Sequence, residues 1–99
     1  MTTKEKEQAA TTARLLQGPV IVTRYVNGRI IATHKRDNEE TWRARVSYYN
    51  GMDAEANHQA AAEKLLSQWP YDHDLVIVGR GHDADAYYWL TVGRWQLEA

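Results

Sequence analysis

Residues 53–69, DAEANHQAAAEKLLSQW, constrain the fold more than any other stretch of the chain. Asp53 is a suitable helix N-cap, because its carboxylate can accept a hydrogen bond from a free N–H of the first turn. The alanines that follow favour a helix, and Trp69 before Pro70 favours its end. At about 100° per residue, one helix face collects an apolar stripe of Ala61, Ala62, Leu65, Leu66 and Trp69. This single stripe needs a sheet to cover it.

The segments on both sides of this helix are typical of strands. Asn27-Gly28 separates two β-rich runs, residues 20–26 and 29–36, and this dipeptide is the strongest signal for a two-residue type I′ hairpin. The turn pairs Val26 with Arg29, Tyr25 with Ile30 and Thr23 with Ala32. Residues 41–49 alternate between apolar and polar side chains, which predicts a half-buried antiparallel strand.

The C-terminal part of the chain predicts two further strands, over residues 75–78 and 87–95, with a flexible loop over 79–85 between them. Both sides of the last strand carry bulky side chains, which predicts a central position in the sheet or a face that meets another subunit. Residues 3–16 predict a short amphipathic N-terminal helix that ends before Gly18-Pro19.

The predicted element order is α-β-β-β-α-β-β. We expect an α+β fold of two layers, an antiparallel sheet of about five strands with one main helix packed on it. The length of 99 residues fits one domain, with residues 1–17 as an N-terminal helix or arm and 20–95 as the core.

Composition indicates a soluble protein and leaves its activity open. The chain has no cysteine, which excludes a disulfide scaffold and a thiolate metal site. No apolar run approaches the ~20 residues of a membrane span, and residues 1–8 lack the apolar region of a signal peptide. We therefore expect a cytoplasmic protein. The net charge of −1 hides an asymmetry, because residues 18–50 are basic by +3 and residues 51–99 acidic by −5.

His58 lies near the centre of the predicted apolar stripe. One interpretation is a histidine at the edge of the core that is hydrogen-bonded to a strand. The other is a ligand-binding or catalytic group, because the pKa of a histidine can cross neutrality with small changes in its surroundings and a helix N-terminus favours anions. For a small anionic ligand, the candidate site combines His58 and Asn57 from the helix with Arg29, Arg45 and Tyr48 from the sheet. Since Arg45 and Tyr48 alternate to opposite sides, such a site needs a sheet edge or a subunit boundary.

A basic sheet face is the second candidate site. Arg43, Arg45 and Tyr49 project from one side of their strand, and Arg24 belongs to the neighbouring hairpin. Basic side chains with aromatic ones are typical of surfaces that bind nucleic-acid backbones and stack bases. A solvated charged face is the alternative interpretation.

Other motifs specify little chemistry. No nucleophile, base and orienting group occur together in a recognisable pattern, so we expect no catalytic site, although a small enzyme with His58 as acid or base stays an alternative. We also expect no metal and no cofactor. The large aromatic residues exceed what one small core needs, which favours a homo-oligomer; they are Trp42, Trp89, Trp95, Tyr49 and Tyr87.

Four short motifs carry a resemblance to a known group of proteins. They are Arg29-Ile30-x-Ala32, Val46-Ser47-Tyr48, Glu55-x-Asn57-His58-x-x-Ala61-Ala62-x-x-Leu65 and Gly79-x-Gly81. In this order, over residues 20–92, the chain resembles a group of small uncharacterised proteins of phages, prophages and plasmids. The resemblance implies a small α+β protein of a phage or mobile element and brings no activity with it. We therefore expect a small non-enzymatic binding protein of bacterial or phage type that acts on a host protein or on a small anionic, nucleotide-like ligand. A nucleic-acid-binding module is the alternative.

Overall fold

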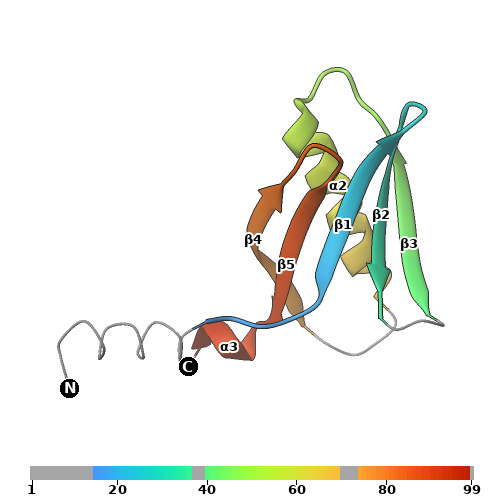
Figure 1. Ribbon diagram of the computed structural model, residues 1–99. Coiled ribbons are helices and arrows are strands. Elements are labelled where there is room, and N and C mark those ends of the chain that lie inside the picture. The colour runs from blue at the N-terminus through green and yellow to red at the C-terminus, as the bar shows by residue number, and fades with distance from the viewer. Residues whose placement is uncertain (1–14, 37–39, 70–73, 99) are drawn as a thin grey trace.

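In the computed structural model, residues 15–36, 40–69 and 74–98 are described (Figure 1). The elements follow one another as β1 (Val20–Val26), β2 (Arg29–Lys35), β3 (Thr41–Ser47), α2 (Ala54–Ser67), β4 (Leu75–His82), β5 (Tyr87–Gly93) and α3 (Trp95–Glu98). The five strands form one antiparallel sheet in the order β3-β2-β1-β5-β4. The predicted α+β fold with one main helix on a five-stranded sheet is confirmed.

The β1–β2 hairpin has the predicted register. Val26 pairs with Arg29, Tyr25 with Ile30 and Thr23 with Ala32. Both turn residues have positive φ, 50° at Asn27 and 80° at Gly28, as a type I′ turn requires. Because successive strand residues point to opposite faces, this register also decides which side chains meet the helix.

Helix α2 covers one face of the sheet, chiefly over β1, β2 and β3 (Figure 1). Asp53 caps its N-terminus, accepting a hydrogen bond from the Ala56 N–H at 2.7 Å. The apolar stripe of the helix packs against inward-facing strand residues to form the core, whose buried members are Ile21, Ile30, Ala32, Ala44, Ala61, Ala62, Leu65 and Trp89. Burying an isoleucine or leucine side chain stabilises the fold by about 1.5–3 kcal/mol, so Ile21, Ile30 and Leu65 each contribute on this scale.

The predicted loop over residues 79–85 is partly wrong, because β4 continues to His82. Gly79 pairs with Leu90, Gly81 with Tyr88 and His82 with Tyr87, after a β-bulge between Ile77 and Gly79. The bulge accommodates one extra residue and lets the pairing resume. β5 lies between β1 and β4, so its predicted central position is confirmed.

The predicted element order also differs at the C-terminal end. The alternation predicts a strand up to Trp95, but β5 ends at Gly93 and residues 95–98 form the short helix α3. Gly93 pairs with Leu75, the first residue of β4, so the ladder ends there. At the N-terminal end, residues 3–14 of the predicted helix lie outside the described residues, and Leu15 and Leu16 are not helical.

Candidate functional site

His58 faces the sheet from α2 and is only 6% exposed. Its Nδ1 lies 2.7 Å from the Thr23 Oγ1, and that oxygen accepts a hydrogen bond from Trp89 Nε1 at 2.9 Å. The Thr23 hydroxyl oxygen thus links the indole N–H of Trp89 to the imidazole of His58 inside the core. The ring of Tyr87 lies against His58, with centroids 4.2 Å apart.

The surroundings of His58 favour its neutral form. Burial lowers the pKa of His58, because the charged ring would lose its hydration, and a hydrogen bond with the Thr23 backbone opposes this shift only in part. The imidazole is therefore neutral at pH 7. A neutral ring whose Nδ1 is already hydrogen-bonded inside the core is the arrangement expected of a structural histidine.

Asn57 holds the loop that precedes α2. Its Oδ1 accepts a hydrogen bond from the Tyr49 N–H at 2.7 Å. Its Nδ2 donates towards the carbonyls of Tyr49, Met52 and Asp53 at 2.9, 3.2 and 3.0 Å. The side chain is 1% exposed, so all its hydrogen-bonding capacity is directed at this loop.

The other residues of the predicted small-anion site lie elsewhere. Tyr48 is half-buried on the helix side, where its ring meets Tyr25 edge to face at 5.5 Å. Arg29 and Arg45 are exposed and belong to the opposite face of the sheet. The structure thus brings Asn57 and His58 together as neighbours on α2 but does not bring either arginine to them.

The opposite face, which no described helix covers, gathers the basic residues. Cross-strand pairing aligns Arg24, Ile31 and Arg45 in one row across β1, β2 and β3. Neighbouring strands are about 4.8 Å apart, so the two arginines flank Ile31 with Cα atoms about 10 Å apart. Arg43 lies two residues before Arg45 on β3, so its side chain is on the same face. The structure thus places Arg24, Arg43 and Arg45 of the predicted nucleic-acid surface on one face of the sheet.

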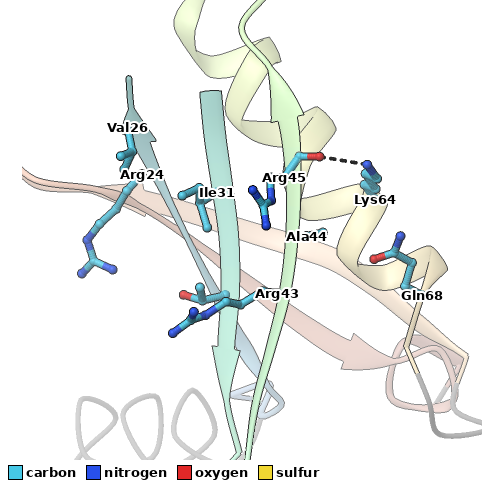
Figure 2. Close-up of a pocket in the computed structure, with 9 residues that line it drawn as sticks. Arg24, Val26, Ile31, Arg43, Ala44, Arg45, Lys64 and Gln68 are labelled. Atoms are coloured by element: carbon cyan, nitrogen blue, oxygen red, sulfur yellow. Dashed lines mark hydrogen bonds between the residues drawn. The ribbon is translucent and has the colours of Figure 1, made fainter. Parts of the chain in front are cut away.

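These side chains border a hollow of about 600 Å³. Figure 2 shows Arg24, Arg43 and Arg45 around Ile31 on the open face, with Lys64 and Gln68 of α2 beyond the edge of β3. The lining residues are Arg24, Val26, Ile31, Thr33, Arg43, Ala44, Arg45, Lys64 and Gln68. The hollow therefore combines an aliphatic floor with cationic walls, and its volume is in the range of small-ligand sites.

Lys64 occupies the free edge of the sheet. Its Nζ donates a hydrogen bond to the Arg45 carbonyl at 2.8 Å. The Arg45 carbonyl therefore points away from β2, and since backbone direction alternates, those of Thr41 and Arg43 do too. A lysine at such an edge discourages pairing with another chain and adds positive charge beside the hollow.

The arginines of the open face are not neutralised by ion pairs within the described ranges. The ion pairs recorded there join Arg36 to Glu40, Arg80 to Glu55 and Arg94 to Asp74, all away from the hollow. Among the described residues, Asp83 interacts electrostatically with Arg24. The hydroxyl of Tyr88 donates to its Oδ2 at 2.7 Å, which lowers the pKa of Asp83 and raises that of Tyr88.

Tyr49, the aromatic member of the predicted nucleic-acid surface, is 63% exposed just after β3. The Tyr48 N–H donates to the Gly28 carbonyl at 2.9 Å, so this segment lies against the β1–β2 turn. Tyr49 therefore lies near the turn end of the sheet and is not among the residues that line the hollow.

Sequence reasoning missed Val26, Ile31 and Lys64 as parts of the hollow. The signal for Ile31 was present, because the Asn27-Gly28 turn places it opposite Arg24. Lys64 could not be found in this way, since its contact with β3 depends on how α2 crosses the sheet. Within the described ranges, no group of three or more His, Cys, Asp or Glu residues could hold a metal ion. Nor is any described helix long and apolar enough to span a membrane.

No protein-family model, curated protein or solved structure matches this chain. The resemblance to small phage and plasmid proteins therefore rests on the short motifs alone, and the function is argued from the geometry of the open face.

Proposed function

We propose that this chain is a non-enzymatic binding protein that takes an anionic ligand on the open face of its sheet. The observation that carries the proposal is the convergence of Arg24, Arg43 and Arg45 on the aliphatic floor of one hollow. Guanidinium groups bind phosphate and carboxylate oxygens in bidentate fashion, and such charge-assisted hydrogen bonds are stronger than neutral ones.

Edge protection alone does not account for this pattern. Charged side chains on edge strand β3 are expected where a sheet must avoid pairing with other chains. Arg24, however, lies on β1, in the middle of the sheet, and Arg29 lies on β2. Positive charge on inner strands beside Val26 and Ile31 supports a binding role over a purely protective one.

The hollow supports binding and not turnover. Its described lining contains no carboxylate, imidazole or thiol, and the amine of Lys64 donates a hydrogen bond to the Arg45 carbonyl. His58, the candidate acid or base, lies on the other side of the sheet with its Nδ1 hydrogen-bonded to Thr23. Retention of an anion is therefore the chemistry that these residues serve best.

Calorimetric titration with pyrophosphate at low ionic strength tests this proposal. We expect binding by the wild-type protein, and about tenfold weaker binding for Arg24→Gln and for Arg45→Gln, because each removes a charge-assisted hydrogen bond. Arg94→Gln is the matched control, since it removes the same charge where Arg94 pairs with Asp74. Absence of wild-type binding, or an equal loss in the control, would overturn the proposal.

A further inference from the structure

A second hollow extends the first along the open face. It has a volume of about 280 Å³ and is lined by Val26, Asn27, Arg29, Ile31 and Arg45. Val26, Ile31 and Arg45 also line the larger hollow, so the two hollows form one groove that follows β2. Arg29 stands at the turn end of this groove and Arg43 at the other.

The groove is longer than a single compact anion needs. Arg43 pairs with Thr33, and Thr33 is four residues from Arg29 along β2. At about 3.3 Å per residue, the two ends of the groove are about 13 Å apart. A nucleic acid chain carries one phosphate per nucleotide, so a groove of this length can meet more than one phosphate of the same chain.

The width of the groove fits one chain and not two. Its arginines come from β1, β2 and β3 only, across about 10 Å. A duplex presents two charged backbones with its bases turned inward, which would leave Val26 and Ile31 without an apolar partner. A single strand exposes its apolar base faces, which Val26 and Ile31 can contact, while its phosphates meet the arginines on both sides, as in other cationic grooves that follow a single-stranded backbone.

We infer that the ligand of the open face is single-stranded nucleic acid, lying along β2 in the groove between Arg43 and Arg29. This inference rests on the proposed anion-binding function and names its ligand class. Arg24 and Arg45 contact the backbone from the two sides of Ile31, and Arg29 and Arg43 contact it at the ends. Because the floor is aliphatic and carries few hydrogen-bonding groups, binding has little base preference.

Fluorescence anisotropy with a mixed-sequence, labelled single-stranded oligonucleotide of about 12 nucleotides tests this inference, in a series of salt concentrations from about 50 to 200 mM. Four phosphate contacts predict a slope of log affinity against log salt of about −2.8, since each contributes about −0.7 for single strands. Arg29→Gln and Arg43→Gln, at the two ends, should each reduce the magnitude of this slope by about 0.7. Arg94→Gln should leave it unchanged.

Two comparisons separate the possible outcomes. Duplex of the same length and polyglutamate should bind at least tenfold more weakly than the single strand, and equal binding of either would overturn the inference. If pyrophosphate binds but the oligonucleotide does not, or if its slope is unaffected by Arg29→Gln and Arg43→Gln, the inference fails while the proposed anion binding stands. If neither probe binds, both fail.

Discussion

At the scale of single residues, the polar side chains fall into two groups, those buried in the fold and those exposed on the open face of the sheet. Asn57 and His58 are neighbours in sequence and both are buried, one holding a loop and the other hydrogen-bonded to Thr23, which also accepts from Trp89. The arginines of the open face are exposed instead. The most conspicuous residue of the sequence, His58, therefore serves stability in this account, and the less conspicuous arginines serve binding.

Removing the His58 side chain should destabilise the fold without affecting the ligand. We expect His58→Ala to lower the free energy of unfolding by about 2–4 kcal/mol, because it opens a cavity and removes the hydrogen bond to the buried Thr23 hydroxyl. Chemical denaturation measures this loss of stability. Titration of the folded variant with pyrophosphate, in the absence of denaturant, should give the wild-type affinity. Weakened anion binding with little loss of stability would instead favour His58 as a ligand-binding residue.

Stability should fall as the solution is acidified. The pKa of His58 is lowered in the folded state, whereas in the unfolded chain it is about 6.5. The unfolded state therefore takes up the proton first, and the free energy of unfolding decreases as pH falls through about 6.5 towards the lower folded pKa. Thermal melting at a series of pH values between about 7.5 and 5.5 measures this. The dependence should shrink in His58→Gln and persist in His82→Gln, which removes an exposed histidine.

At the scale of elements, local patterns predicted those features that depend on neighbouring residues. The Asn27-Gly28 turn, the hairpin register and the Asp53 cap are of this kind, because a few adjacent residues decide their backbone geometry. The extension of β4 past Gly79 and the end of β5 at Gly93 depend on partners distant in sequence, so local alternation could not reveal them.

The candidate site divides in the same way. Alternation along each strand assigned Arg24, Arg43 and Arg45 to faces, but their convergence requires the strand order β3-β2-β1 and the packing of α2 on the other face. The predicted site around His58 combined residues from opposite faces of the sheet. The alternation in the sequence already assigned Arg45 and Tyr48 to opposite faces. In the structure, Arg29 and Arg45 lie on the face away from α2.

The hairpin turn allows a matched test of backbone geometry. Gly28 has φ of 80°, and a Cβ there would meet no atom within 4 Å. Gly28→Ala should therefore lower the free energy of unfolding by about 1–2 kcal/mol, because of the left-handed backbone conformation alone. At Gly81 a Cβ also meets nothing within 4 Å, and φ lies outside that region. Gly81→Ala should be neutral or slightly stabilising in urea denaturation, and equal losses for both variants would contradict a backbone origin.

At the scale of the whole molecule, one end of the sheet carries an exposed apolar cluster. Gln96 Nε2 donates to the Gln17 carbonyl at 2.7 Å, which places α3 beside the segment that leads into β1. Both segments carry exposed apolar residues, Leu15 and Leu16 before β1 and Trp95 and Leu97 in α3. Of the aromatics that favoured an oligomer, Trp89 is buried in the core, whereas Trp95 is 72% exposed. Self-association thus stays a prediction, now centred on Trp95.

Light scattering over a concentration series tests that prediction. We expect the mass to rise above the 11.4 kDa of one chain, and Trp95→Ser to reduce this rise, since exposed apolar clusters mark contact surfaces. Tyr49→Ser is a suitable control, because Tyr49 is similarly exposed at the opposite end of the sheet. A monomer at all concentrations, or an equal effect of both substitutions, would remove the cluster from consideration.

The central claim is that anions bind on the open face of the sheet and not around the N-terminus of α2. An amide chemical-shift titration with pyrophosphate on ¹⁵N-labelled protein tests it most directly, because each residue reports separately. The account predicts that the largest shifts fall on Arg24, Ile31, Arg43 and Arg45, with small changes at Tyr48, Asn57 and His58. Largest shifts at Asn57 and His58, with β1 to β3 unaffected on their open face, would contradict it.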